Sequence, residues 1–258
     1  MHKPLLLWML AAATTQAGLV EKPVLYQHAA VTLEGFHVYD DAKSGRRPAV
    51  LVIHQWTGLS DYEKRRSRQL AEMGYNVFAA DVYGQGVRPQ PPESGKEAAK
   101  YKSDRSIFRG RLMAALEILK SDERTDPARV AAIGYCFGGT GALELARAGS
   151  DLAGVVSFHG SLDRAADLYT PKHGVKAKVL VLHGAVDPYV PREQVAAFED
   201  EMTAAGADWQ LVSYGGAVHS FTHKEAGDDS SKGAAYNENA DRRSWQAMKS
   251  FFSEIFGE

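Results

Sequence analysis

The sequence predicts an α/β fold with a mostly parallel central sheet, helices on both faces and no separate lid domain. Short apolar runs rich in β-branched residues alternate with longer charged or amphipathic segments, which is typical of parallel strands joined by crossover helices. The 258 residues are 45% hydrophobic, enough for one sizeable core. Since no linker or repeat divides the chain, we expect a single domain over residues 18–258.

Each expected strand is a short apolar run, as strands buried on both faces are. These runs cover residues 49–54, 76–81, 129–135, 152–160, 178–184 and 209–216. The expected helices cover residues 61–73, 104–121, 137–148, 192–205 and 234–256. Residues 84–96 are rich in Gly and Pro and are expected to form a loop.

Residues 1–17 resemble a secretory signal peptide. Lys3 supplies positive charge, residues 4–13 form an apolar run too short to span a bilayer, and Thr15-Gln16-Ala17 is a suitable cleavage site. The alternative is a retained apolar segment that packs on the domain. Cleavage implies export to the periplasm, and retention implies a cytoplasmic protein. No other stretch is long and apolar enough to cross a membrane.

The charge balance gives no sign of a nucleic-acid partner or of a general basic surface for anionic lipids. Lys and Arg total 30 and Asp and Glu total 32, for a formal net charge of −2. The single cysteine, Cys136, cannot form an internal disulfide. Its thiol is therefore a small core group, an intermolecular link or a reactive group. The sequence does not indicate an oligomeric state.

Cys136 lies in Gly134-Tyr-Cys-Phe-Gly138, between an expected strand and an expected helix. A strand, a Gly-x-nucleophile-x-Gly turn and a helix form a nucleophile elbow, here with Cys in place of Ser. Small residues are needed where the backbones of such a turn approach each other. The helix N-terminus favours a thiolate and a developing oxyanion. We therefore expect Cys136 to be a catalytic nucleophile rather than a buried core cysteine.

A nucleophile of this kind needs a histidine base and an acid that orients the base. Asp187 and His219 follow expected strands downstream of Cys136, in the chain order nucleophile, acid, histidine. Asp163 is the alternative acid, although it lies later in a loop. His223 is the alternative base. The residues expected to wall an apolar and rather open pocket are Trp56, Tyr83, Tyr189 and Phe221.

Two functions of other classes compete with this interpretation. His54, His159 and His183 also lie near strand ends, so together with His219 they could form a metal site in a metal-dependent hydrolase. No spaced His/Asp/Glu pair on a helix supports that site, so we expect no metal and no other cofactor. The second alternative is a non-catalytic binding or sensing protein that uses the thiol of Cys136.

The chain resembles the dienelactone hydrolase family of α/β-hydrolases from about Leu51 onward, through the motifs VIHQWTGLSDY, ADVYG, GYCFGG, GAVDPYVP and HSF. The resemblance implies an α/β-hydrolase fold and a triad of Cys136, Asp187 and His219. It also implies that the oxyanion hole consists of the backbone N–H groups of Phe137 and Trp56.

Three positions depart from the family pattern. Gln55 stands where the family usually has a Glu that pairs with the resting thiol. Gln85 and His223 stand where dienelactone hydrolases have two arginines that hold the substrate carboxylate, although Arg88 is near in sequence. Gln and His are weak substitutes for the bidentate guanidinium. We therefore expect a small neutral substrate rather than an anionic dienelactone.

The expected function is hydrolysis of neutral activated carboxylic esters or lactones through a thioester at Cys136. Side activity on neutral phosphotriesters is also expected, because the same N–H donors can stabilise an anion formed on phosphorus. A true dienelactone hydrolase, or carboxymethylenebutenolidase, is the alternative within this enzyme class.

Overall fold

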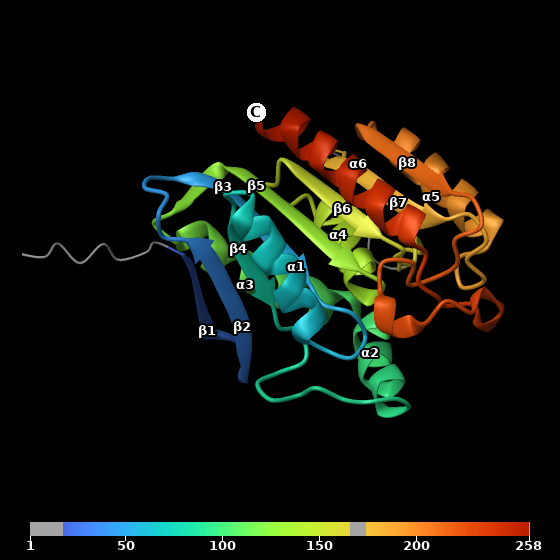
Figure 1. The fold of residues 1–258 in the computed structure, drawn as a ribbon, viewed down its shortest axis with the longest axis horizontal. Coiled ribbons are helices and arrows are strands. Elements are labelled where there is room, and N and C mark those ends of the chain that lie inside the picture. The colour runs from blue at the N-terminus through green and yellow to red at the C-terminus, as the bar shows by residue number, and fades with distance from the viewer. Residues whose placement is uncertain (1–17, 166–173, 258) are drawn as a thin grey trace, which may run out of the picture.

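The structure is a computed structural model of the chain and describes residues 18–165 and 174–257. The expected signal peptide lies outside these residues. An 8-stranded sheet runs through the molecule in the order β1-β2-β4-β3-β5-β6-β7-β8 (Figure 1). The strands are β1 (Leu19–His28), β2 (Val31–Asp40), β3 (Arg47–Ile53), β4 (Asn76–Ala80), β5 (Thr125–Tyr135), β6 (Gly154–Phe158), β7 (Lys178–Gly184) and β8 (Trp209–Tyr214). The β1–β2 and β2–β4 pairs are antiparallel and all other neighbouring pairs are parallel.

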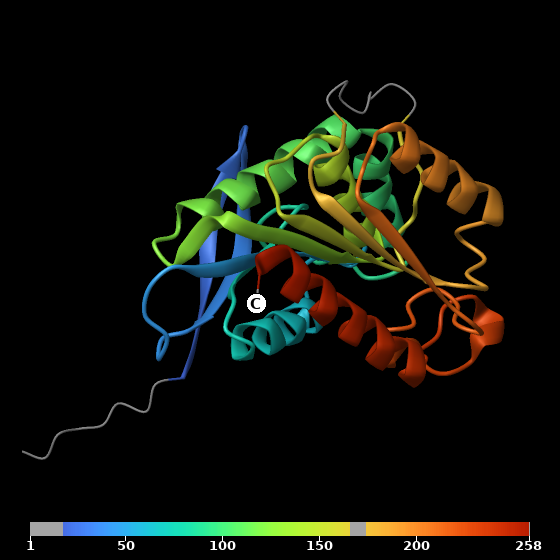
Figure 2. The same cartoon turned by 90° about the horizontal axis from the view of Figure 1, so that it is seen from above.

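The helices cover both faces of the sheet, as expected. They are α1 (Asp61–Glu72), α2 (Glu93–Ser103), α3 (Arg105–Ser121), α4 (Phe137–Arg147), α5 (Arg192–Ala204) and α6 (Glu238–Phe256). Helices α1 and α6 lie on one face, and α3, α4 and α5 lie on the other (Figure 2). The α/β fold with a mostly parallel sheet is confirmed.

The strands are apolar on both faces because each face packs against a different layer of helices. In β3, Ala49, Leu51 and Ile53 belong to the core beneath α3 and α4. Val50 and Val52 belong to the core beneath α1 and α6. Successive side chains of a strand point to opposite faces, so this central strand needs apolar residues at every position.

The structure differs most from the expectation at four places, and at one of them β5 begins at Thr125 rather than at residue 129. The β1–β2 hairpin was not expected, because edge strand β1 is mostly exposed and contains Pro23, which weakens the strand pattern. Helix α2 replaces the end of the expected loop at residues 84–96. It buries only Ser94, Ala98 and Tyr101, too few for a clear helical pattern. Helix α6 begins at Glu238 rather than residue 234, because the Asn237 side chain caps it.

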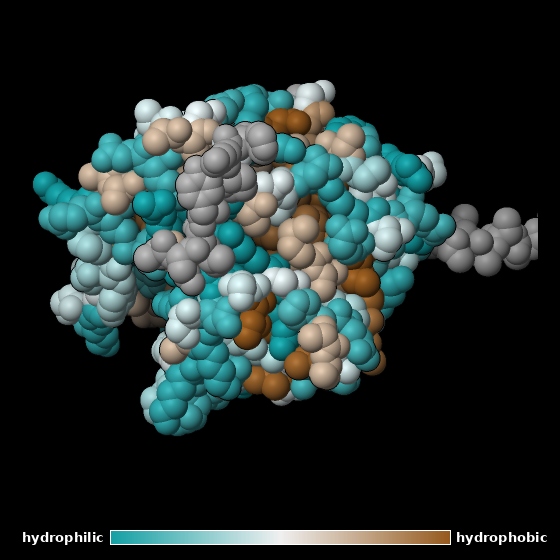
Figure 3. Space-filling view, turned by 180° about the vertical axis from the view of Figure 1, so that it is seen from behind, coloured by the Kyte–Doolittle hydropathy of each residue, from teal (hydrophilic) through white to brown (hydrophobic). Residues whose placement is uncertain are grey.

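On the face seen in Figure 3, hydrophilic side chains dominate and hydrophobic ones form small separate groups. Scattered exposed apolar residues of this kind are ordinary. Three of the largest exposed hydrophobic residues, Trp56, Val186 and Tyr189, belong instead to loops at the carboxyl ends of strands, where the candidate site lies. Within residues 18–165 and 174–257, no helix is long and apolar enough to span a membrane.

Candidate active site

Cys136 sits in a strained turn between β5 and α4. Its backbone has φ 55° and ψ −115°, a conformation that costs a non-glycine residue about 1–3 kcal/mol. Glycines allow the turn to close, because a Cβ at Gly134 would lie 1.9 Å from the carbonyl oxygen of Gly138. A Cβ at Gly138 would lie 2.2 Å from the carbonyl oxygen of Ile53. The turn therefore raises the half-buried thiol above the carboxyl end of the sheet.

Cys136, His219 and Asp187 form one continuous hydrogen-bonded chain. His219 Nε2 lies 3.0 Å from Cys136 Sγ, and His219 Nδ1 lies 2.8 Å from Asp187 Oδ2. The Asp187 side chain is fully buried, and that of His219 is 13% exposed. This is the geometry of a nucleophile, a base and an orienting acid.

The loops that carry the acid and the base are fixed by further hydrogen bonds. The other carboxylate oxygen of Asp187 accepts from the N–H of Tyr189 at 2.8 Å. His219 forms an isolated bridge with Ala234, in which its N–H donates to Gly233 and its carbonyl accepts from Ala235. These hydrogen bonds fix the backbone around both residues.

The thiol and the imidazole shift each other's pKa in opposite directions. Burial raises the pKa of Cys136, but the charge and hydrogen bond of His219, the Lys102 ammonium and the Phe137 N–H together lower it below its usual value. Burial lowers the pKa of His219, but the Cys136 thiolate and the bond to Asp187 raise it above its usual value. These directions favour a thiolate–imidazolium pair at neutral pH.

The alternative acid and base occupy other interactions. Asp163 accepts hydrogen bonds from Arg105 at 2.8 Å and from the Ser161 hydroxyl at 2.6 Å. The His223 ring packs on Tyr62 with 4.8 Å between ring centroids. Neither Asp163 nor His223 belongs to the hydrogen-bonded chain of Cys136.

The other strand-end histidines are buried around the site rather than gathered at one point. His159 Nε2 lies 2.8 Å from the Thr222 hydroxyl, and burial lowers the pKa of His159 well below its usual value. Burial also lowers the pKa of His183. In the part of the chain that the structure describes, no three His, Cys, Asp or Glu side chains are grouped so as to hold a metal ion.

A pocket of about 380 Å³ opens beside the thiol. Helix α2, the loop after β3, the start of α4 and the loops after β6, β7 and β8 all contribute to its walls. Its lining residues are Trp56, Gly95, Ala98, Lys102, Cys136, Phe137, Thr140, Ser161, Tyr189, Val190, His219, Ser220 and Ala234. The lining is mainly apolar, with a few polar groups near the reactive thiol, as is usual for small-molecule sites.

Of the expected pocket residues, Trp56 and Tyr189 line this pocket and the others do not. Tyr83 and Phe221 are core residues. The Gln85 amide donates to Glu34, and Arg88 contacts Asp81 and lines a different hollow. His223 lies against Tyr62 as described above. Gln55 is buried, but the hydrogen-bond partner of Cys136 Sγ is His219.

Two residues that line the pocket, Phe137 and Trp56, have backbone N–H groups with no acceptor within a described helix or strand. Phe137 is the first residue of α4, so its N–H has no helical partner. The N–H of Trp56 has no acceptor among the described residues. The contact between Gly138 and the end of β3 brings these two segments together. Phe137 and Trp56 both line the pocket, and their assignment as the oxyanion hole stays a prediction.

Glu63 was not recognised from the sequence, although Ser60-x-x-Glu63 is a capping-box motif. Its carboxylate is fully buried and accepts from the N–H of Gln55 at 3.0 Å and from the N–H of Ser60 at 2.9 Å. Glu63 thereby attaches the loop that contains Trp56 to the start of α1.

Lys102 was also missed, because α2 was not expected. Lys96 and Lys100 each pair with a glutamate three residues earlier, but Lys102 has Ala98 and Ala99 in the positions from which a helical partner would reach it. Among the described lining residues, Lys102 is the one lysine or arginine. The signal that could have identified Lys102 is that it alone among these three lysines has no glutamate three or four residues earlier in the sequence.

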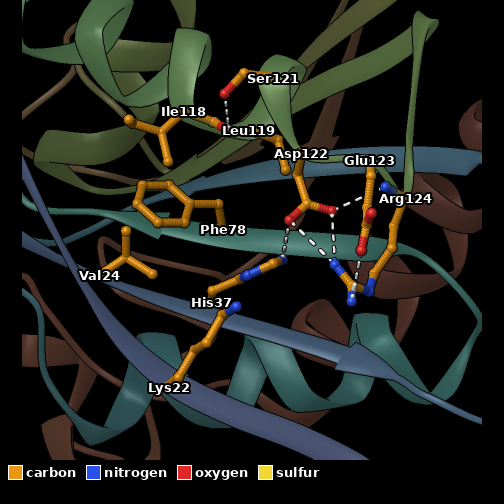
Figure 4. A pocket seen from close by; sticks show the side chains of 10 residues that line it. All are labelled: Lys22, Val24, His37, Phe78, Ile118, Leu119, Ser121, Asp122, Glu123 and Arg124. Carbon is orange, nitrogen blue, oxygen red and sulfur yellow. Dashed lines mark hydrogen bonds and ion pairs between the residues drawn. The ribbon is translucent and has the colours of Figure 1, made fainter.

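A second hollow of about 380 Å³ lies near the start of β5, at the opposite end of that strand from Cys136 (Figure 4). Asp122 lies between His37 and Arg124 there, and Arg124 also pairs with Glu123 at 3.1 Å. Most of its charged groups pair with one another, and its one hydroxyl, that of Ser121, donates to the carbonyl oxygen of Ile118 rather than to a base. The pocket at Cys136 is therefore the candidate active site.

Comparisons with known proteins identify the family that the chain resembles. The model of the dienelactone hydrolase family matches residues 33–256. A solved structure described as a dienelactone hydrolase-like promiscuous phosphotriesterase from metagenomic libraries is 39% identical, with a TM-score of 0.87, and the match covers 93% of this chain and 99% of that one. A structure named m3DLH is 36% identical, also with a TM-score of 0.87, over the same shares of the two chains. An uncharacterized protein of Caenorhabditis elegans is 38% identical over 162 residues, which are 60% of this chain and 98% of that protein.

Substitution of Lys102 should weaken the thiolate form of Cys136. In Lys102→Gln the loss of a nearby cation raises the thiol pKa, so less thiolate is present at any pH below the titration midpoint. We expect alkylation of Cys136 by iodoacetamide to slow about twofold to fivefold in that range, since an exposed cation contributes about 1 kcal/mol at most. Lys102→Arg keeps the charge and should retain the parent profile. Superimposable pH–rate profiles for the parent and Lys102→Gln would contradict this role.

Proposed function

We propose that this chain, which belongs to the dienelactone hydrolase family of α/β-hydrolases, hydrolyses neutral activated carboxylic esters or lactones by means of Cys136. The observation that carries the proposal is the hydrogen-bonded chain from Cys136 through His219 to Asp187, at 3.0 and 2.8 Å, beside a largely apolar pocket. A small-molecule substrate fits both the family and the pocket volume of about 380 Å³.

In the proposed reaction the Cys136 thiolate attacks the ester carbonyl, and a C–S bond forms. The His219 imidazolium then gives its proton to the departing alkoxide, and the acyl group remains on sulfur as a thioester. Neutral His219 next removes a proton from water, and the resulting hydroxide attacks the thioester. The acid product leaves, and the thiolate–imidazolium pair is restored. Asp187 keeps the imidazole oriented and stabilises its positive charge.

The backbone N–H groups of Phe137 and Trp56 are the proposed donors to the tetrahedral oxyanion. Removal of one such donor from other enzymes reduces transition-state stabilisation by about 3–4 kcal/mol. The absence of an acceptor for the Trp56 N–H among the described residues supports its assignment. The position of Phe137 at the N-terminus of α4 adds the favourable end of the helix dipole.

Replacement of the thiol is the first test. Cys136→Ala should lower ester turnover by about 10³-fold or more, while the far-UV circular dichroism spectrum and the melting temperature stay near those of the parent. The fold should persist because glycines, rather than the thiol, allow the turn to close. A folded Cys136→Ala protein with near-normal turnover would refute the proposal.

Neutral substrates should be preferred over carboxylate-bearing ones. No arginine lines the pocket among the described residues, and Lys102 lacks the planar fork of a guanidinium. For a matched pair of a neutral ester and its carboxylate analogue, we expect kcat/KM to favour the neutral member by about 10²-fold. A clear preference for the anion would favour a true dienelactone hydrolase and would point to Lys102 as its anchor, since Arg88 lies elsewhere.

We also propose slow turnover of activated aryl phosphotriesters. One similar structure is described as a promiscuous phosphotriesterase, and the chemistry offers a reason. Thiolate attack on phosphorus forms an S–P bond and releases an aryloxide, and water then cleaves the S–P bond and restores the thiol. Because a thiolate leaves more readily than an alkoxide, a cysteine enzyme can complete the cycle where a serine enzyme stops.

This idea is tested with Cys136→Ser and one aryl phosphotriester. We expect continued aryloxide release from the parent and a single equivalent from the serine variant, because its phosphoserine ester resists water. Mass spectrometry of the intact protein should show a persistent phosphoryl adduct on the variant and little on the parent. Stoichiometric inactivation of the parent would limit the activity to carboxylic esters.

A further inference from the structure

A buried histidine that takes no part in the proposed reaction lies directly behind the loop of Trp56. His54 follows the last residue of β3 and is fully buried. Its ring stacks on that of Phe137, with 5.8 Å between centroids and 18° between planes, and meets Tyr83 edge-on at 4.7 Å. The ring therefore has a fixed orientation in the core.

The hydrogen bonds of His54 define which nitrogen carries the proton. The backbone N–H of Val82 donates to His54 Nε2 at 3.1 Å. Since a backbone N–H can only donate, Nε2 must hold a lone pair, and the proton of a neutral ring must lie on Nδ1. His54 Nδ1 then donates to the carbonyl oxygen of Gln55 at 2.6 Å. Burial lowers the pKa of His54, which keeps this neutral form.

The carbonyl that His54 binds belongs to the same peptide unit as the Trp56 N–H. A second donor, the N–H of Gly58, reaches that carbonyl oxygen at 3.1 Å. The Gln55–Trp56 bond is trans, so its C=O and N–H point in opposite directions. By fixing the carbonyl on the side of His54, the structure directs the N–H of Trp56 away from the core.

We propose that His54 is a positioning residue that orients the Trp56 N–H for the oxyanion. The inference rests on the proposed function, in which that N–H is an oxyanion donor. His54 also connects the two donors, because its ring stacks on Phe137, whose own N–H is the second one. On the far side of Trp56, the Tyr83 hydroxyl donates to the Trp56 carbonyl at 2.9 Å, so both peptide units around Trp56 are anchored.

Two substitutions separate the two hydrogen bonds of His54. In His54→Asn the side-chain NH₂ can take the place of Nδ1 and donate to Gln55, while the acceptor for Val82 is lost. In His54→Gln the longer side chain can accept from Val82, while the donor to Gln55 is lost. The two variants remove similar ring contacts, so each is a control for the other.

If His54 positions the Trp56 N–H, His54→Gln should lower kcat about tenfold to a hundredfold, with KM changed by about twofold at most. His54→Asn should keep kcat within about fivefold of the parent. Alkylation of Cys136 by iodoacetamide should proceed at the parent rate in both variants, because displacement of iodide places no negative charge on a carbonyl oxygen.

Equal loss of kcat in the two variants, parent-like kcat in His54→Gln, or alkylation that slows in step with turnover would each overturn the inference. Ester turnover that survives complete alkylation of Cys136 in the parent would overturn the proposed function, and this inference with it. A failure confined to the His54 variants leaves the proposed function standing.

A measurement on the unmodified protein keeps the inference testable if both variants fail to fold. Nitrogen-15 NMR of labelled histidine distinguishes the Nδ1–H and Nε2–H tautomers, and the His54 signals are assigned through their proximity to the Val82 amide. We expect the Nδ1–H tautomer of His54 throughout the pH range of activity. An Nε2–H tautomer, or a protonated ring at the pH of maximal turnover, would overturn the inference.

Discussion

The close approach of three backbone segments at Gly134 and Gly138 is the constraint on which the site depends. Helix α4 starts so near the ends of β3 and β5 that side chains at these two glycines would collide with main-chain atoms. The same approach forces Cys136 to φ 55° and brings the N–H of Phe137 close to the loop after β3. This close packing thus creates the strained turn and raises the half-buried thiol, and the side chains of His219 and Asp187 are added from loops farther along the chain.

The pKa values of the thiol and the imidazole depend on a small number of charged groups in the site. The thiol and the imidazole are the strongest influences on each other, because burial removes the water that would otherwise screen them. At position 55, where the resemblance to the family implies a glutamate, this chain has a neutral amide, so no carboxylate at that position competes for the proton of the thiol. Lys102 adds positive charge from the rim. The directions of the two pKa shifts favour an ion pair between the thiol and the imidazole, to which Asp187 and Lys102 also contribute.

Much of the fold and part of the site could be predicted from the sequence. The central strands and the elbow are recognisable because complete burial demands apolar residues at every position, and because the tight turn demands glycine. Strand β1 and helix α2 were missed because many of their residues are exposed, and exposure removes the periodic pattern on which such predictions rest. Gln85 and Arg88 were expected in the pocket from the position of a family arginine and from nearness to it in sequence, and Phe221 was expected as a pocket wall, but sequence position does not reveal in which direction a loop side chain points.

Helix α2 has a consequence for how this pocket can change. It forms one wall of the pocket and supplies Gly95, Ala98 and Lys102 to its lining, yet only three of its residues are buried. A wall with so little core contact contributes little to global stability, so substitutions along it alter the shape and charge of the pocket without disturbing the strained turn or the sheet. Apart from Lys102, which lowers the pKa of the thiol, the residues of α2 thus belong to a part of the molecule separate from the reactive groups. Over evolution, or in the laboratory, the range of accepted substrates can diversify on α2 while the chemical apparatus stays constant.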